Sequence, residues 1–345
     1  MSLRSEIFNQ VSVIDRLLQH RMGVVQDIAA EIGKRDIKFI FLAARGTSDN
    51  AGLYAKYLWG AFNQLPIALA APSLFSMYEK PPALKNALVL GISQSGQSPD
   101  IVSVVAEGRR QGVSTMAITN DPGSPLAQEA EFVIDLDTGP EKAVAATKTY
   151  TAQLMAIAMF SVAMKGDKKR LLDLERVPVL IQQVLELDDT IERVTERYRY
   201  MQQCVVLGRG YNYSTAFEWS LKLKELAYVV AEPYSSADFQ HGPMAILSHG
   251  FPVFAVVPQG AVFADMMELL STLVRDYNVE LLVVSNEGQV LELAQTPLRI
   301  PTNMPEWLSP IVCIVPAQLF SFHLTQARGF DTEKPRGLRK VTLTR

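Results

Sequence analysis

Short apolar runs alternate along the chain with longer stretches in which apolar residues recur at helical spacing. This alternation is typical of α/β proteins with parallel sheets. After a helical start that extends to about residue 32, the first half is expected to contain strands at 39–43, 87–92, 115–119 and 132–136, and helices at 50–64, 99–111 and 147–165. The second half is expected to contain strands at 204–207, 253–257 and 280–284, and helices at 214–231 and 265–277. We therefore expect an α/β fold with a mostly parallel sheet, flanked by helices, in each half.

The second half looks like a copy of the first. Three landmarks recur in the same order, 164 to 166 residues apart: the Arg-Gly pairs 45–46 and 209–210, the glycines 96 and 260, and the polar turns 119–121 and 285–287. A tandem duplication explains this spacing. Leu, Glu, Asp and Arg at helical spacing dominate 168–200, where we place the boundary. The expected parts are an N-terminal helical segment 1–34, a first domain 35–167, a connector 168–200, a second domain 201–330 and a tail 331–345.

The loop after the second strand differs between the copies in a way that predicts a ligand site. It reads Ser-Gln-Ser-Gly-Gln-Ser at 93–98, but Pro-Gln-Gly-Ala-Val at 258–262. A helix start offers free backbone N–H groups and a favourable dipole to an anion, and hydroxyl and amide side chains add donors. Pro99 suits the first helical position. The candidate phosphate ligands are Ser93, Gln94, Ser95 and Ser98, with Gly46, Thr47 and Ser48 from the loop after the neighbouring strand.

An alternative is that these Ser/Gly/Gln loops are simple turns. Two such loops in one domain, with hydroxyls absent from the matched second-half loop, favour ligand binding. The sequence contains no Gly-x-x-x-x-Gly-Lys motif and no Gly-x-Gly-x-x-Gly motif after a strand, which argues against nucleotide and dinucleotide sites.

The composition, 48% hydrophobic and 20% charged, is that of an ordinary soluble globular protein. A net charge of −3 argues against a nucleic-acid partner. Cys204 and Cys313 lie in apolar stretches and are expected in the core, with no disulfide and no metal site. The start of the chain has no signal-peptide pattern, and the longest apolar run, 152–164, is too short to span a membrane. We expect a cytoplasmic protein without a membrane segment and without a cofactor.

Candidates for chemistry occur in the second half. Lys222 and Glu225 are three residues apart and share a helix face, where a surface ion pair is the simpler interpretation. His241 precedes Gly-Pro in a loop, a setting in which a functional and a structural histidine are about equally expected. The tail at 335–340 is basic, and it is either a solvated terminus or part of a site.

Together these motifs resemble the double sugar-isomerase (SIS) domain family, and in particular the isomerase half of glutamine–fructose-6-phosphate aminotransferase. The resemblance covers nearly the whole chain, through 6–10, 46–48, 93–96, 144–148, 221–225, 234–243 and 335–340. The combination of Leu-Lys-Leu-Lys-Glu, His-Gly-Pro and the Pro-Arg-x-Leu-x-Lys tail is highly specific. It implies two tandem SIS domains, each a flavodoxin-like three-layer α/β/α structure, with a tail that closes the active site.

The resemblance also implies roles for residues. Glu225 would shuttle a proton between C1 and C2, supported by Lys222, and His241 would open the sugar ring. Lys340 would contact the substrate carbonyl or form a Schiff base with it. The phosphate would be held by Thr47, Ser93, Gln94, Ser95 and Ser98, with Val144 and Ala145 near the sugar. A homodimer is expected by analogy.

Three departures from the aminotransferase refine this expectation. Met1-Ser2 provides no N-terminal cysteine, so we expect no glutaminase domain and no use of glutamine. Gln97-Ser98 stands where the aminotransferase typically has Glu-Thr, and Ala146 stands where it has Ser. The tail form resembles stand-alone SIS-type deaminases more closely. The leading hypothesis is interconversion of glucosamine-6-phosphate with fructose-6-phosphate and ammonia; the alternatives are a fructosamine-6-phosphate deglycase and a non-catalytic sugar-phosphate sensor.

Overall fold

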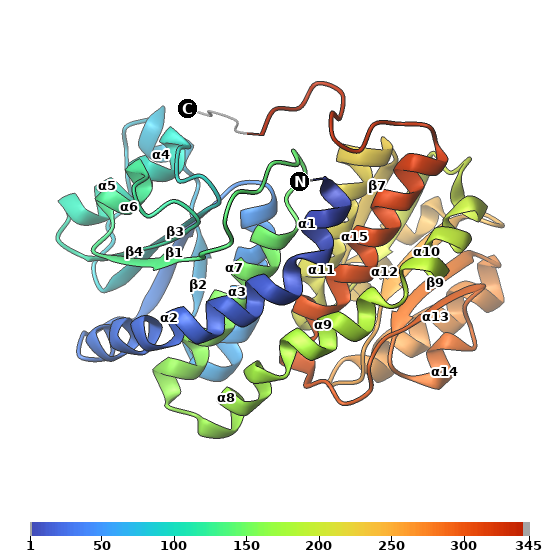
Figure 1. Ribbon diagram of the computed structural model, residues 1–345, viewed down its shortest axis with the longest axis horizontal. Coiled ribbons are helices and arrows are strands. Elements are labelled where there is room, and N and C mark those ends of the chain that lie inside the picture. The colour runs from blue at the N-terminus through green and yellow to red at the C-terminus, as the bar shows by residue number, and fades with distance from the viewer. Residues whose placement is uncertain (1, 341–345) are drawn as a thin grey trace. The chain divides into compact units, whose positions relative to one another are not determined.

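A computed structural model of the protein describes residues 2–340 (Figure 1). The described chain forms two compact units. The N-terminal unit contains residues 9–142 and 146–176, together with the end of the tail from Arg339. The C-terminal unit contains the N-terminal residues up to Phe8, the short segment 143–145 and residues 177–338. Each unit is described by itself below.

The N-terminal unit is built on a five-stranded parallel sheet in the order β2-β1-β3-β4-β5. The strands are β1 (Phe39–Ala43), β2 (Ile67–Leu69), β3 (Ala87–Ser93), β4 (Ser114–Thr119) and β5 (Phe132–Asp135). Every residue of β3 and β4 is buried, because the central strands of a parallel sheet are covered on both faces. This double burial explains why these strands read as nearly continuous apolar runs.

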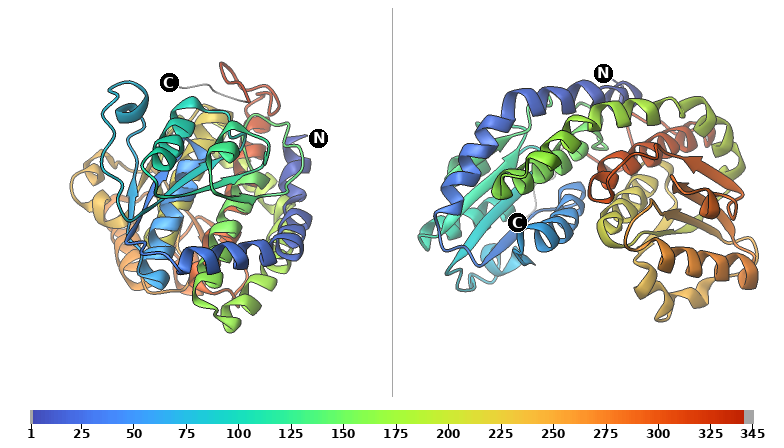
Figure 2. Two further views of the ribbon diagram at one scale, coloured as in Figure 1. Left: turned by 90° about the vertical axis from the view of Figure 1, so that its left-hand side faces the viewer. Right: turned by 90° about the horizontal axis from the view of Figure 1, so that it is seen from below.

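Helices cover both faces of this sheet (Figures 1 and 2). On one face, α3 (Thr47–Asn63) and α2 (Gln10–Gly33) pack against the almost completely buried α7 (Lys148–Lys165). On the other face, α5 (Pro99–Arg110) packs between two short helices, α4 (Ser73–Ser76) and α6 (Pro125–Glu129). The next helix, α8 (Lys168–Glu175), contacts α7. The unit is therefore a three-layer α/β/α structure, as the sequence pattern predicts.

The C-terminal unit repeats this arrangement with the strand order β10-β9-β8-β6-β7. The strands are β6 (Gln203–Leu207), β7 (Val230–Tyr234), β8 (Pro252–Val256), β9 (Glu280–Ser285) and β10 (Thr296–Arg299). One layer of helices consists of α1 (Leu3–Phe8), α9 (Val177–Leu185), α10 (Asp188–Thr195), α11 (Tyr213–Lys222) and α15 (Ser309–Ala327). The remaining helices are α12 (Ser236–Gln240), α13 (Phe263–Tyr277) and α14 (Gly288–Leu291).

The two sheets confirm the predicted fold class and its duplication. Numbered along its own half, each sheet has the flavodoxin-like order 2-1-3-4-5, whose topological switch point lies between its first and third strands. An ion pair is duplicated as well: Arg45 Nε lies 2.8 Å from Asp100 Oδ2 in one unit, and Arg209 pairs with Asp265 in the other. In both cases, the arginine follows the first strand and the aspartate lies in the first turn of the helix after the third.

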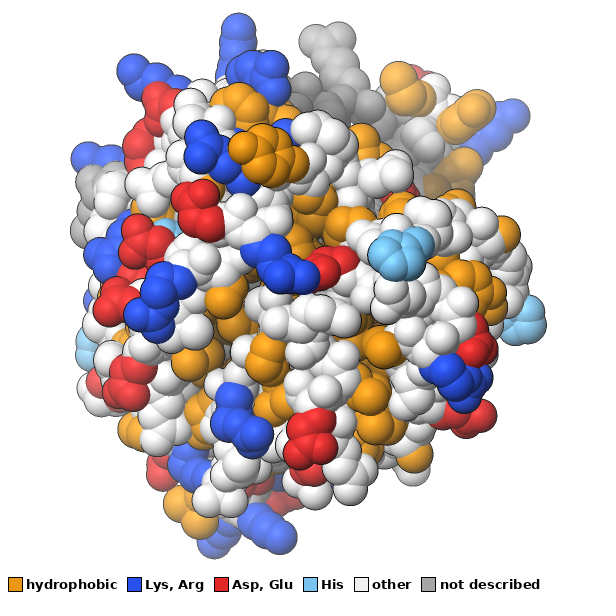
Figure 3. Space-filling model, turned by 90° about the vertical axis from the view of Figure 1, so that its right-hand side faces the viewer, with side chains coloured by type: hydrophobic (Ala, Val, Ile, Leu, Met, Phe, Trp, Pro, Cys, Tyr) orange, Lys and Arg blue, Asp and Glu red, His pale blue; other side chains and the backbone are white. Residues whose placement is uncertain are grey.

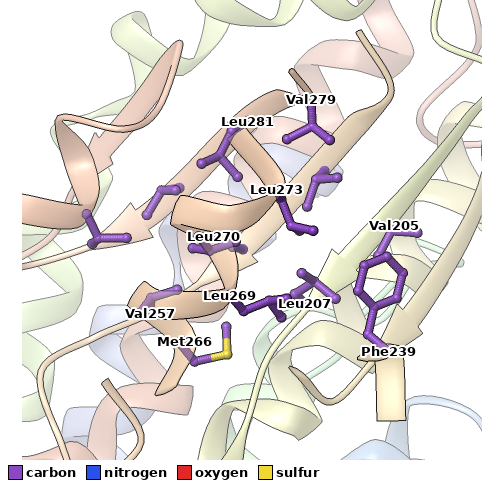
Figure 4. Packing of buried hydrophobic residues seen from close by; sticks show 14 of the residues in the cluster. Val205, Leu207, Phe239, Val257, Met266, Leu269, Leu270, Leu273, Val279 and Leu281 are labelled. Atoms are coloured by element: carbon purple, nitrogen blue, oxygen red, sulfur yellow. The ribbon is translucent and has the colours of Figure 1, made fainter. Parts of the chain in front are cut away.

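The core of the C-terminal unit lies between its sheet and α13. Leu269, Leu270 and Leu273 of α13 pack against strand residues such as Val205 and Leu281 (Figure 4). Burying each aliphatic side chain of this kind contributes about 1.5–3 kcal/mol. The amphipathic spacing in 265–277 thus identifies the side of α13 that packs against the sheet.

One stretch among the described residues, 306–327, is long and apolar enough by composition to cross a membrane. The most apolar 18 residues of this stretch are all buried, and the stretch forms η5 (Glu306–Leu308) and the core helix α15 of the C-terminal unit. Cys313 lies on this helix, and both Cys204 and Cys313 are free and buried, as expected from their apolar surroundings. Burial raises the pKa of both thiols above the ordinary value.

Several sequence-based boundaries were wrong. The helix expected at 214–231 ends as α11 at Lys222, continues as a π-helical turn, η3 (Leu223–Ala227), and gives way to β7. The short strands β2 and β10 and the helix α15 were not predicted. A helix that is buried all round has no amphipathic period to detect, and three- or four-residue edge strands carry too little alternation.

Charged side chains of both signs are interspersed on the face shown in Figure 3. No large patch of one sign forms there. Such mixing is typical of protein surfaces that do not depend on a strong electrostatic field.

Candidate functional site

The predicted phosphate loops lie in the N-terminal unit at the carboxyl ends of β1 and β3. These two strands are neighbours in the sheet and flank its topological switch point, where ligands bind in open α/β sheets. Gly46 precedes α3 with φ +53°, and Gly96 lies in the other loop with φ +61°. The tertiary structure therefore brings the two loops to one edge, as their position after the strands predicts.

Gly96 is required by both conformation and space. A Cβ at this position would lie 2.1 Å from the hydroxyl oxygen of Ser124, and φ is in the left-handed region. The backbone N–H of Gly96 donates to Ser93 Oγ at 3.1 Å, while its carbonyl accepts from Leu126 N at 3.1 Å. The loop is thus held in shape by one hydrogen bond within it and one from α6.

The other loop residues differ in how they are engaged. Ser95 Oγ accepts from the N–H of Gln97 at 3.3 Å, and Ser98 occupies the N-cap position of α5 with Pro99 after it. Thr47 is partly buried at the start of α3. Ser48 is buried and accepts from Gln153 Nε2 of α7 at 2.9 Å, a contact that ties the loop to the helix layer.

The sequence reasoning missed Glu141, a fully buried carboxylate beside the phosphate loop. Its oxygens accept from the N–H groups of Thr147 and Thr149 at 2.9 and 3.1 Å, at the start of α7. They also accept from the side chain of Gln94 and from Lys340 Nζ, the latter at 2.9 Å. Four donors around one buried side chain make it the organising group of this region.

Little in the sequence marks Glu141. It precedes Lys142 in a polar loop after Gly-Pro, and such a pair usually faces solvent. The only signal was its place just before the 144–148 motif. Through Glu141, the structure brings together two residues that the sequence analysis had singled out separately, Gln94 and Lys340.

Val144 and Ala145, predicted to lie near the sugar, belong by their contacts to the C-terminal unit. Val144 is partly buried and Ala145 is buried. Next to them, the N–H of Ala143 donates to the buried carboxylate of Glu6 at 3.2 Å. This contact holds the short segment 143–145 against the N-terminal helix α1.

Lys222 and Glu225 form a cluster in the C-terminal unit together with Glu218. Lys222 Nζ lies 2.5 Å from Glu225 Oε2 and 3.3 Å from Glu218 Oε1. The side chains of Lys222 and Glu218 are 1% and 0% exposed, whereas that of Glu225 is 24% exposed. A surface ion pair was the simpler interpretation of the sequence, and it is wrong because the ammonium is buried.

Electrostatics in this cluster keep Lys222 charged. Burial alone would lower the pKa of Lys222, but the carboxylates of Glu218 and Glu225 raise it above the usual value. Glu225 lies on the π-helical turn η3 rather than on a regular helix. Turns of this kind are frequent at functional sites. The arrangement places a partly exposed carboxylate next to a fixed, buried cation.

His241 lies at the end of α12, with an exposed side chain, and its N–H donates to the carbonyl of Asp238 at 3.1 Å. The structure thus groups Lys222 with Glu225 in the C-terminal unit and, through Glu141, Gln94 with Lys340 in the N-terminal unit. No arrangement of three or more His, Cys, Asp or Glu suited to a metal ion occurs in residues 2–340.

Known proteins match this chain over nearly its full length. The glutamine–fructose-6-phosphate aminotransferase (isomerizing) of Thermus thermophilus is 32% identical over 97% of this chain, which spans 57% of that relative's length. Among solved structures, a candidate phosphosugar isomerase from Silicibacter pomeroyi is 31% identical with a TM-score of 0.86 over 96% of this chain and 100% of its own. The C-terminal domain of glucosamine-fructose-6-phosphate aminotransferase from Francisella tularensis is 28% identical with a TM-score of 0.87, covering 96% of this chain and 98% of that one.

A family model identifies the same two repeats that the strand order of the sheets shows. The SIS domain model matches twice, at residues 35–163 and at residues 200–328. Each match contains one complete five-stranded parallel sheet. With two copies of this domain and the repeated strand order, the chain belongs to the SIS-domain family.

Proposed function

We propose that this chain interconverts glucosamine-6-phosphate with fructose-6-phosphate and ammonia. The observation that carries the proposal is the cluster of Glu218, Lys222 and Glu225, in which a partly exposed carboxylate adjoins a buried ammonium. An isomerisation between C1 and C2 needs one group that removes a proton and returns it. A carboxylate beside a fixed cation suits this task, because the cation stabilises negative charge that develops nearby.

In the proposed reaction, His241 donates a proton to the ring oxygen, and the opened sugar has an aldehyde at C1 and an amine at C2. Glu225 removes the C2 proton to form an enolamine and returns a proton to C1, which leaves an imine at C2. Water hydrolyses this imine to the ketone of fructose-6-phosphate and releases ammonia. Lys340 contacts the carbonyl oxygen, or forms a Schiff base with that carbon, and Lys222 holds Glu225.

The phosphate group is assigned to the loops at the switch point. Polar side chains supply donors there, and the positive end of the α5 dipole favours an anion. The residues assigned to phosphate binding are Gly46, Thr47, Ser48, Ser93, Gln94, Ser95 and Ser98, with Val144 and Ala145 assigned to the sugar. The relatives that resemble this chain are named for fructose-6-phosphate or phosphosugar chemistry, which supports the substrate class.

A panel of amino-sugar phosphates tests the reaction. We expect the purified chain to release ammonia from glucosamine-6-phosphate and to form it from fructose-6-phosphate with free ammonia, but not with glutamine. Release of an amino acid from a fructosamine-6-phosphate, with no ammonia from glucosamine-6-phosphate, would indicate the deglycase. Binding without turnover of any substrate would indicate a sensor. The proposal includes a cytoplasmic homodimer, and light scattering would measure the subunit number.

The variant Glu225→Gln tests the central residue. It keeps size and hydrogen-bonding capacity but cannot act as a base, so we expect kcat to fall about 10²–10⁴-fold with little change in KM. The matched control is Glu232→Gln, which removes an exposed carboxylate from β7 and should leave kcat unchanged. Near-normal turnover of the Glu225 variant would overturn the assignment of the base.

A further inference from the structure

The tail that follows α15 is attached to the C-terminal unit at two points. The carboxylate of Glu333 accepts from the N–H of Leu3 at 3.0 and 3.2 Å. Farther along, the N–H of Arg336 donates to the hydroxyl of Tyr228 at 2.8 Å. Pro335, between these points, is buried. The basic tail is therefore anchored to the C-terminal unit, although residues 336–339 are exposed.

The second attachment is reinforced by aromatic contacts. The guanidinium carbon of Arg336 lies 3.8 Å from the centroid of the Tyr228 ring and 5.4 Å from that of Phe330. The two rings pack edge to face with centroids 4.8 Å apart. A cation over an aromatic face within about 6 Å is attracted by the ring quadrupole. Side-chain and backbone groups of Arg336 thus hold the same tyrosine.

Tyr228 is itself fixed by the turn that carries Glu225. It caps η3 with φ +55°, a left-handed conformation that non-glycine residues seldom adopt. Such a conformation persists only where the surroundings enforce it. Because Glu225 is three residues earlier, one turn holds both the assigned base and the attachment point of the tail.

We propose that Tyr228, Phe330 and Arg336 form a latch that fixes the tail and so positions Lys340. The inference rests on the proposed function, in which Lys340 meets the substrate. Lys340 is four residues beyond Arg336, so an intact latch confines its Cα to within about 14 Å of Arg336 along the chain. Without the latch, the nearest earlier residue that is held is the buried Pro335, and the free segment before Lys340 lengthens from 337–339 to 336–339. A longer free segment spreads the lysine over more positions.

The contact that Lys340 already makes is compatible with this role. Its ammonium donates to Glu141 within the N-terminal unit, and an ammonium has three donors. One donor can remain on Glu141 while another meets an oxygen of the substrate. Tyr228 and Arg336 are accordingly positioning residues that act through Lys340.

Two variants separate the components of the latch. Tyr228→Phe removes the hydroxyl that accepts from the backbone of Arg336, and Arg336→Met removes the cation while keeping the length of the side chain. For each, kcat with glucosamine-6-phosphate should fall about 2- to 30-fold, the range of one cation–π or hydrogen-bond contact, while KM changes little. Arg336→Lys should recover part of the rate. The matched control is Lys334→Met, an exposed tail residue whose change should leave kcat unaltered.

A second readout follows the tail directly. Trypsin should cleave after Arg339 or Lys340 faster in both latch variants than in the wild type or the Lys334 control, as followed by mass spectrometry. Wild-type kcat together with wild-type cleavage in both variants would overturn the latch, and so would faster cleavage with unchanged kcat. If the wild type itself turned over no amino-sugar phosphate, the proposed function would fall, and the cleavage comparison would still decide whether the latch holds the tail.

Discussion

One buried charged residue organises each of the two clusters of candidate site residues. Glu141 and Lys222 each lie inside a unit and each satisfies its charge by specific partners: backbone amides and Lys340 for Glu141, two carboxylates for Lys222. Burying a charge is costly unless it is paired and hydrogen-bonded. The sequence presents both as ordinary polar residues, with Glu141 next to Lys142 and Lys222 close to Lys224. Only burial separates them from solvated neighbours such as Lys142 and Lys224.

Glu141→Gln is expected to reduce the free energy of unfolding by about 1–3 kcal/mol, because an amide leaves some of the surrounding donors without an acceptor. The comparison is Lys340→Met, which leaves Glu141 with Gln94 and the two amides of α7. Urea denaturation of both variants shows which contacts dominate. A larger loss in the Glu141 variant is expected. Equal losses would mean that the ion pair with Lys340, rather than the start of α7, accounts for the stability.

At the scale of elements, the loop after β3, at 93–98, and its copy after β8, at 258–262, have diverged. In the C-terminal unit, a Cβ on Gly260 would lie 2.1 Å from the carboxyl carbon of Glu306, and the N–H of Ala261 donates to Glu306 Oε2 at 2.9 Å. An internal carboxylate from η5 thus accepts a hydrogen bond from the loop that leads into α13. The matching loop in the N-terminal unit has Ser and Gln side chains instead. This difference agrees with assigning the phosphate to the first copy only.

Glu306→Ala is expected to lower the free energy of unfolding by about 0.5–1.5 kcal/mol, the usual net contribution of one hydrogen bond. The exposed Glu292 supplies a control, since Glu292→Ala should change stability by less than about 0.5 kcal/mol. Thermal and urea unfolding measure both variants. If the two behave alike, the carboxylate of Glu306 does not stabilise this loop.

At the scale of the molecule, two units share one strand order but differ in their polar loops. Fold and ligand binding are therefore separable here. The duplicated sheet supplies the same scaffold twice, and the loop after the third strand carries serine hydroxyls only in the N-terminal unit. A ligand that binds only the folded form of one unit stabilises that unit by mass action.

We expect glucosamine-6-phosphate at about 100 times its Kd to add roughly 2.7 kcal/mol to the stability of the unit that binds it. Hydrogen exchange should slow in the 93–98 loop and remain unchanged in the 258–262 loop. Ser95→Ala should weaken the protection of the first loop by removing a hydroxyl donor. Equal protection of both loops, or of neither, would contradict the assignment of the phosphate to the N-terminal unit.

The sequence by itself determined the features that depend on local pattern. The central strands, the amphipathic helices, the 164-residue repeat and the Ser-Gln-Ser-Gly loop all follow from short-range periodicity and turn chemistry, and the structure has them where the pattern indicates. Gly96 and Pro99 belong to this class. Gly96 lies in a loop of turn-forming residues, and Pro99 stands at the first position of the helix that follows. The family resemblance could be recognised for the same reason.

The tertiary structure alone decided which polar groups are buried and with which partners. Glu141 meets Lys340 across 199 positions of the sequence, and Arg336 meets Tyr228 across 108. The conversion of the expected helix end into a π-helical turn followed by β7 likewise depends on pairing with β6. Desolvation and long-range pairing are properties of the folded environment, so no local pattern encodes them. They are what turned a presumed surface ion pair into a buried cluster and a basic tail into an anchored one.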